Sequence, residues 1–88
     1  MARRLLVAEE AHRGPGRGVL LSPRFVPDPG TPRALTVRLA LPDGGARTTL
    51  AEVQFAHVRG PLPPYALLRL PDLQPEDVPA GTEVWTVD

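Results

Sequence analysis

Residues 34–41 carry an alternating pattern that strongly constrains how this chain can fold. Every second side chain is large and apolar: Leu35, Val37, Leu39 and Leu41. Successive side chains of a β-strand point to opposite faces, so a period of two places these four on one face. The Asp43-Gly44 pair that follows is typical of a tight hairpin turn. The pattern predicts a half-buried strand whose hairpin partner is 47–58, where Ala51, Val53 and Phe55 alternate with polar residues.

Twelve prolines and eight glycines divide the rest of the chain into short apolar runs. Because these residues favour turns, the runs indicate an all-β protein. Pro75 and the two acids after it predict one helical or 3₁₀ turn within 72–79. We expect a single domain, residues 1–88, and a small antiparallel barrel rather than a sandwich, since closure removes exposed edges. The six expected strands are 3–11, 17–26, 34–41, 47–58, 65–70 and 82–87, with Pro23 marking an edge or a bulge in the second.

The charge and the composition restrict the class of partner. Ten arginines balance ten acidic residues and there is no lysine, so the net charge is zero. A protein that binds nucleic acid through phosphates usually has a basic excess, so RNA binding would need a local patch. The chain has no cysteine for a disulfide or a thiolate metal site. Its longest apolar run, residues 5–8, is too short to span a membrane, so we expect a cytoplasmic protein and no membrane partner.

Motifs for catalysis are missing from the sequence. His12 and His57 are far apart and do not have a metal-ligand spacing, and Ser22 lies outside a nucleophile motif. The adjacent acids Glu9 and Glu10 would point to opposite faces of a strand, so they cannot share one substrate bond. The glycines form no phosphate-binding loop. We therefore expect no enzyme activity, no catalytic residue, no metal and no cofactor.

Two groups of residues are candidates for binding. Arg13, Arg17, Arg24 and Arg33 could form a basic patch for phosphate or carboxylate groups, unless surface acids neutralise it. Trp85 and Tyr65 could be exposed contact residues, but a thin core favours a packing role for both. This expectation is strongest for Trp85, which lies between Val84 and Val87 in an apolar segment.

Both ends of the chain carry a recognisable order of motifs. An apolar run with an acidic pair and a Gly-Arg-Gly turn lie near the start, within 5–12 and 14–24, and a Leu-Leu-Arg strand, an acidic turn and a glycine lie near the end, within 65–70 and 74–82. This order resembles the second domain, a β-barrel, of elongation factor Tu and related translational GTPases. The resemblance implies a six-stranded Greek-key barrel. It also implies contact with the aminoacylated end of tRNA through Glu9, Glu10, His12, Arg17 and Ser22. The nucleotide-binding domain is absent from this chain, so no GTP site is expected.

Three functions are compatible with these observations. The first is a stand-alone, non-catalytic barrel that binds a protein partner or a small ligand, and a protein is the first expectation. The second is a module that binds RNA or the end of a tRNA. The third is a small enzyme that uses His12 with Glu9 or Glu10, and it is the weakest of the three. The candidate binding residues are Glu9, Glu10, His12, Arg17, Ser22 and Arg24.

Overall fold

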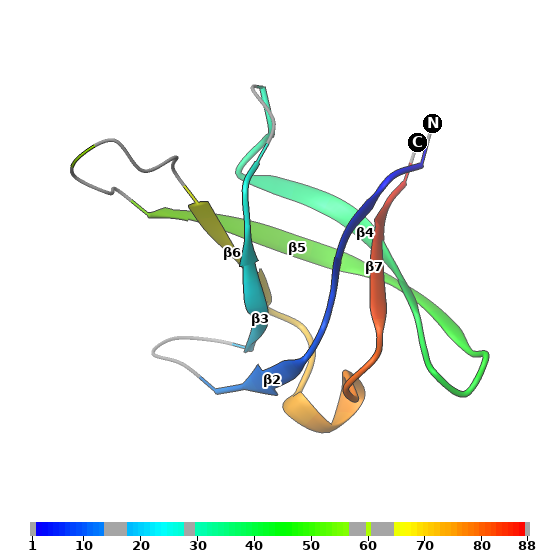
Figure 1. Ribbon diagram of the computed structural model, residues 1–88. Coiled ribbons are helices and arrows are strands. Elements are labelled where there is room, and N and C mark those ends of the chain that lie inside the picture. Colours follow the sequence, from blue (N-terminus) through cyan, green and yellow to red (C-terminus); the bar gives the residue numbers. More distant parts are fainter. Residues whose placement is uncertain (1, 14–17, 28–29, 57–59, 61–64, 88) are drawn as a thin grey trace.

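The computed structural model describes residues 2–13, 18–27, 30–56, 60 and 65–87 of the chain (Figure 1). All neighbouring strands in these residues pair antiparallel, in the order β1-β7-β4-β5-β6-β3-β2. The strands are β1 (Arg4–Val7), β2 (Glu10–His12), β3 (Val19–Phe25), β4 (Ala34–Ala40), β5 (Ala46–Ala56), β6 (Tyr65–Leu70) and β7 (Glu83–Thr86). A single 3₁₀ turn, η1 (Pro75–Asp77), precedes β7. The all-β antiparallel class and the short turn at Pro75 are therefore confirmed.

The predicted hairpin is formed by β4 and β5, which pair from Ala34↔Glu52 to Ala40↔Ala46. In its turn, the amide of Leu41 donates to the carbonyl oxygen of Gly45 at 2.8 Å, and Asp43 Oδ1 accepts from the amide of Gly45 at 2.8 Å. Gly44 has a φ of 95°, a conformation that favours glycine. The turn residues thus explain why the chain reverses here.

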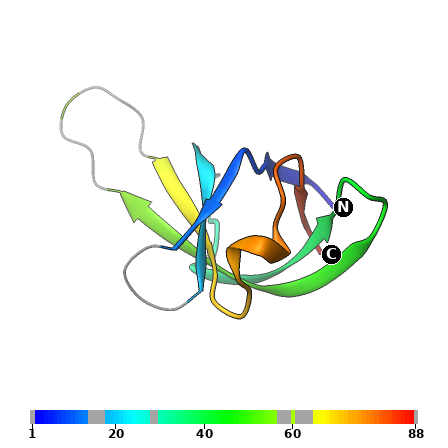
Figure 2. The ribbon, with the colours of Figure 1, turned by 90° about the horizontal axis from the view of Figure 1, so that it is seen from below.

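Within the described residues, the expected six strands are corrected to seven, because the first expected strand, 3–11, is divided in two. The amide of Ala8 donates to the carbonyl oxygen of Thr82 at 2.8 Å, whereas the amide of Glu9 donates to that of Ser22 at 2.7 Å. The chain therefore changes partner between these residues, from β7 on one side to β3 on the other. The two halves, β1 and β2, are the first and the last strands in the order of the sheet. The sheet is consequently curled into a half-barrel (Figure 2).

The core fills the concave side of this sheet. Val37 and Leu39 are fully buried and Leu35 packs against the core, as their alternation predicts. Leu41 is only half-buried, because it lies beyond the end of β4. From β5, Ala51 and Val53 are buried, but Phe55 is 38% exposed. The buried apolar residues are Leu6, Ala8, Val19, Leu21, Val37, Leu39, Ala51, Val53, Ala66, Leu68, Leu70, Leu73, Val78 and Val84.

Strand β3 packs closely against the end of β6 and contains the predicted irregularity. Its register against β6 shifts between Leu21 and Phe25, around Pro23, which confirms the expected bulge. At its start, Gly18 has a φ of 84°, and a Cβ atom there would overlap the carbonyl oxygen of Leu70 and lie 2.5 Å from Pro71 Cα. Only glycine allows this approach of two backbones. No helix in the described residues is long and apolar enough to cross a membrane.

Candidate functional site

Three of the predicted binding residues lie together on the outer side of β2 and β3. Glu10 is directly opposite Ser22, and His12 is opposite Leu20. Residues opposite each other in an antiparallel pair share one face of the sheet. Glu10 and His12 are exposed, whereas Ser22 is half-buried. We call these four residues, Glu10, His12, Leu20 and Ser22, the β2–β3 surface.

The other predicted residues lie outside this group. Glu9 is exposed and precedes β2, so it is not the strand neighbour of Glu10 that the sequence indicated. Arg24 is exposed within the irregular stretch of β3, and its guanidinium lies 4.5 Å from the centroid of the Tyr65 ring on β6. Arg17 lies outside the described residues.

The three described arginines of the expected basic patch, Arg13, Arg24 and Arg33, have different surroundings. Arg13 Nη2 donates to Gln74 Oε1 at 2.7 Å, near η1. Arg24 stacks on Tyr65, and Arg33 is exposed just before β4. These three side chains therefore have separate surroundings.

Trp85 is not a core residue, which corrects the expectation from sequence. Its neighbour Val84 is fully buried on the concave side of β7. Adjacent strand residues point to opposite faces, so Trp85 and Glu83 lie on the outer side, where both are half-buried. The apolar segment 84–87 contributes only Val84 to the core.

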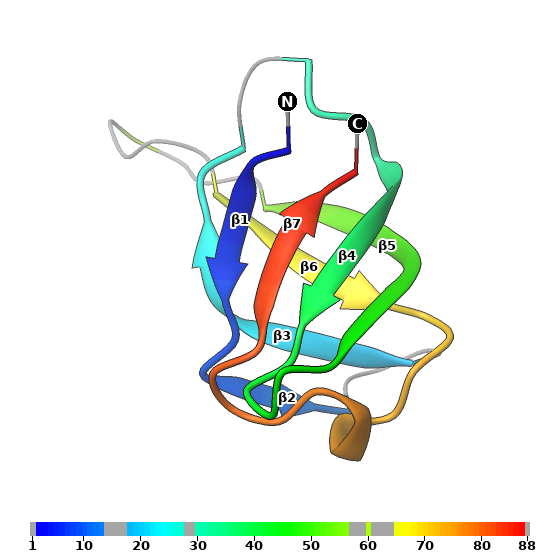
Figure 3. The same cartoon turned by 90° about the vertical axis from the view of Figure 1, so that its right-hand side faces the viewer.

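Two arginines flank Trp85 on this outer side. Strand β7 lies between β1 and β4 (Figure 3), and Trp85 is directly opposite Arg4 on one side and Arg38 on the other. Arg38 is in turn opposite Thr48 on β5. The result is one row of side chains across four strands, with the indole between two cations.

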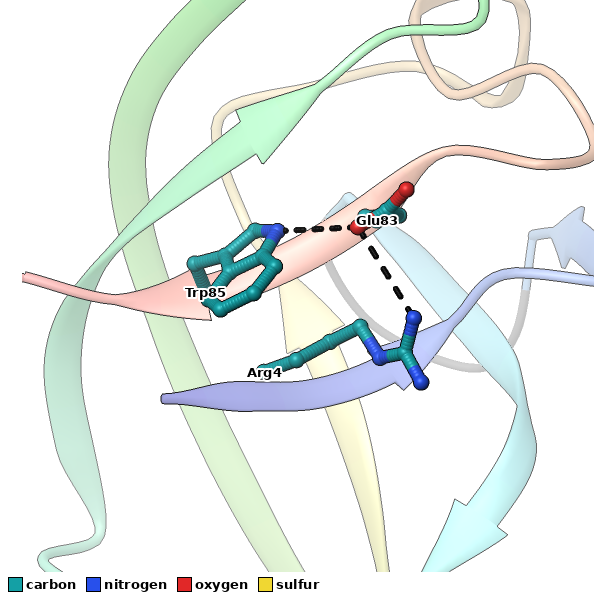
Figure 4. A network of polar contacts seen from close by, with 3 residues as sticks. All are labelled: Arg4, Glu83 and Trp85. Carbon is teal, nitrogen blue, oxygen red and sulfur yellow. Dashed lines mark hydrogen bonds and ion pairs between the residues drawn. The ribbon is translucent and has the colours of Figure 1, made fainter. Parts of the chain in front are cut away.

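A small polar network holds the indole ring (Figure 4). Trp85 Nε1 donates to Glu83 Oε1 at 3.2 Å, and Arg4 Nη1 lies 3.9 Å from the same oxygen. The side chains of Arg4 and Glu83 are 53% and 40% exposed, so this ion pair is worth no more than about 1 kcal/mol. Arg38 is exposed and makes no ion pair or hydrogen bond of its side chain within the described part of the chain.

A hollow of about 320 Å³ lies beside the indole, lined by Ala2, Arg38, Ala40, Trp85 and Thr86. Ala40 is directly opposite Glu83 and follows Arg38 on the same face of β4. Its small side chain leaves space next to the large ring. We call Arg4, Arg38, Ala40, Glu83 and Trp85 the Trp85 surface.

A second hollow, of about 440 Å³, lies between the β4–β5 turn and η1. Its acids are used to hold the backbone. Asp77 Oδ2 accepts from the amide of Gln74 at 2.8 Å, and Asp77 Oδ1 lies 3.8 Å from Arg47 Nη1. Asp43 holds its own turn, as described above. Asp43 and Asp77 in this hollow therefore have structural roles, and we do not take it as the binding site.

In the described residues, no group of three or more histidines and acids is placed to hold a metal ion. No protein-family model, curated protein or solved structure matches this chain. A function for the Trp85 surface must therefore be inferred from the geometry of its own residues.

Proposed function

We propose that this protein is a non-catalytic binding module that binds a protein partner through the Trp85 surface. The observation that supports it is the position of Trp85, whose ring lies on the outside of the sheet between Arg4 and Arg38. Tryptophan and arginine are enriched among the residues that dominate binding energy in protein interfaces. Here both types occur in one row, beside a hollow that can accept a side chain.

The indole is also ordered before any partner binds. The hydrogen bond to Glu83 favours one orientation of the ring, and paired strands on both sides of β7 hold the backbone of Trp85 in place. A side chain that is already fixed loses little conformational entropy on binding, so more of the contact energy contributes to affinity. The half-buried ring can still bury apolar area, at about 25 cal/mol per Å².

The resemblance to the second domain of elongation factor Tu remains part of this proposal, with its Greek-key barrel as the finer description of the half-barrel. It is supported by the positions of the matching residues. The two ends of the chain that carry it meet where the amide of Ala8 donates to the carbonyl oxygen of Thr82. A barrel domain that binds other molecules is consistent with a non-catalytic role.

A second candidate function is favoured by the β2–β3 surface. Glu10, His12 and Ser22, which match the tRNA-end region of that family, lie on one face. Binding of an RNA end there predicts salt-sensitive affinity that falls when Arg24 is changed to glutamate. Fluorescence anisotropy with labelled single-stranded RNA at low salt tests it, and no change in anisotropy would exclude it.

The protein-binding function is tested by selecting peptides from a displayed random library on the wild-type protein. Each selected peptide is then measured on Trp85→Ala and on Tyr65→Ala, a matched control in which the other outward aromatic is removed. We expect affinity to fall at least about tenfold with Trp85→Ala and to change less than about twofold with Tyr65→Ala. Circular dichroism checks that both variants fold. Equal binding to both variants, or a library that yields no binder, would contradict the proposal.

A further inference from the structure

We infer that the segment bound at the Trp85 surface is extended and acidic, with an apolar residue between two carboxylates. This inference rests on the proposed function and adds the chemical class of the partner. Three features carry it: an arginine without a side-chain partner among the described residues, a second arginine that is only weakly held, and the spacing of the two across the indole.

Arg38 supplies the first carboxylate site. Its guanidinium is exposed and has no ion pair or hydrogen bond among the described residues. A guanidinium presents its donors in a planar fork that matches the two oxygens of a carboxylate. Arg38 also lines the hollow next to Trp85, so a carboxylate bound there would lie close to the ring.

Arg4 supplies the second carboxylate site. Its contact with Glu83 is long, at 3.9 Å, and both side chains are about half exposed. Glu83 Oε1 is in addition shared with the Trp85 indole, so it cannot satisfy all the donors of Arg4. The remaining donors on Arg4 are available to an incoming carboxylate.

The spacing can accommodate an extended segment. Arg4 is on β1 and Arg38 is on β4, and these two strands are separated by β7. Their Cβ atoms are therefore roughly 10 Å apart. In an extended peptide, alternate side chains share a face and are roughly 6.6 Å apart. The pattern acid-x-apolar-x-acid thus covers roughly 13 Å on one face. The length of the arginine side chains accommodates the difference, with the apolar residue over Trp85.

An acidic peptide fits this surface better than a nucleic acid does. The affinity for a nucleic acid increases with the number of phosphates that the protein neutralises. The Trp85 surface has two arginines, and Glu83, two residues from Trp85 on β7, would repel the closely spaced phosphates of a nucleic acid. A peptide needs only two carboxylates in the right places.

The test uses the full chain and four labelled probes of equal length. Three are twelve-residue peptides with the central patterns Glu-x-Leu-x-Glu, Gln-x-Leu-x-Gln and Lys-x-Leu-x-Lys, and the fourth is a twelve-nucleotide oligouridylate. Affinity is measured by anisotropy. Emission of Trp85, the single tryptophan in the chain, reports whether each probe binds at this surface. The proteins are the wild type, Arg38→Glu and Arg33→Glu.

We expect the acidic peptide to bind the wild type about tenfold more tightly than the neutral one and to change Trp85 emission. Arg38→Glu should weaken the acidic peptide about tenfold and strengthen the basic one. Arg33→Glu has the same change of net charge, but Arg33 lies just before β4, five residues from Arg38, which is roughly 16 Å along an extended chain. It should change affinity less than about twofold at physiological salt, because exposed charges more than about 8 Å apart are largely screened.

The contradicting outcomes are distinct. If the neutral or the basic peptide changes Trp85 emission and binds as tightly as the acidic one, the acidic class is wrong but the binding function stands. If the oligouridylate binds at Trp85 more tightly than the acidic peptide, the partner is RNA. If none of the four probes binds, the acidic class is wrong, and the library selection on Trp85→Ala decides the binding function separately.

Discussion

The β2–β3 surface and the Trp85 surface are both on the outside of the half-barrel, but they offer different contacts. The first lies at one end of the strand order, where β2 is three residues long and exposes Glu10 and His12. The second is centred on β7, which is paired on both sides. Short, charged edge strands discourage pairing with other chains. A paired strand with an outward tryptophan instead has a rigid centre that can bury apolar area.

The two surfaces therefore differ in the role we assign to them: charged residues on the edge strand limit unwanted pairing, whereas the Trp85 surface is proposed to bind a partner. The backbone groups of an edge strand can be reached by any other strand, so charged side chains there reduce unwanted association. The backbone of β7 is already paired, and only its side chains are available to a partner. Selectivity at the Trp85 surface thus depends on Trp85, Arg4 and Arg38, and variants of these residues distinguish the two regions.

The largest expected effect concerns the support of β3, and so of the β2–β3 surface. Gly18→Ala should lower the free energy of unfolding by about 3 kcal/mol or more, because the new Cβ overlaps the backbone at Leu70 and Pro71. Gly44→Ala is the matched control, with a φ of 95° and nothing within 4 Å, and should cost about 1 kcal/mol. Urea denaturation of both variants measures the difference. Equal losses would mean that β3 does not approach β6 in this way.

The second effect is on binding. Trp85→Ala should weaken an acidic peptide at least about tenfold, or about 1.4 kcal/mol. Trp85→Phe should recover part of the affinity, because the ring area is retained without the hydrogen bond to Glu83. Glu10→Ala, on the β2–β3 surface, should leave it unchanged. Anisotropy titrations compare the three variants, and a loss with Glu10→Ala that equals the loss with Trp85→Ala would remove the distinction.

How far these two regions could be predicted from the sequence depends on the separation of their residues along the chain. The β2–β3 surface comes from two strands close together in the sequence, and the resemblance to a known family indicated three of its residues, Glu10, His12 and Ser22. Arg4, Arg38 and Trp85 come from the start, the middle and the end of the chain. They meet because β7 inserts between β1 and β4, and alternation within a single strand contains no information about strand order.

The same reasoning applies to the fold. The alternation in 34–41 and the Asp43-Gly44 turn act locally, so β4, β5 and the burial of Val37, Leu39, Ala51 and Val53 were predictable, whereas the exposure of Phe55 was not. The break between β1 and β2 was not, because Leu5 to Ala8 is continuous and apolar, and the break arises from the change of partner at Ala8 and Glu9. The outward position of Trp85 depends on that same pairing and was missed for the same reason.

A smaller effect on peptide affinity tests the long contact between Arg4 and Glu83. Glu83→Gln should raise the affinity of the acidic peptide about threefold, because Arg4 loses its competing carboxylate while the amide oxygen can still accept from Trp85. Glu76→Gln has the same change of charge on η1, away from this surface, and should have no effect. Anisotropy titrations at low salt measure both. A lower affinity with Glu83→Gln would show that Glu83 assists binding rather than competing with it.

The smallest effect belongs to the pair beside the β2–β3 surface. Arg24→Ala should cost about 0.5 kcal/mol of stability, since an exposed cation over an aromatic ring contributes little. A double-mutant cycle with Tyr65→Leu isolates the interaction, measured by urea denaturation. A coupling energy near zero would mean that the two groups do not interact in solution.

The most direct test of the central claim is a titration of nitrogen-15-labelled protein with the acidic peptide, followed by amide and indole NMR signals. Because the chain has a single tryptophan, the indole signal belongs to Trp85. We predict that the indole N–H of Trp85 and the amides of Arg38 and Arg4 shift most, while those of Glu10, His12 and Ser22 do not move. The largest shifts at Glu10, His12 and Ser22, with the indole signal unchanged, would contradict the account.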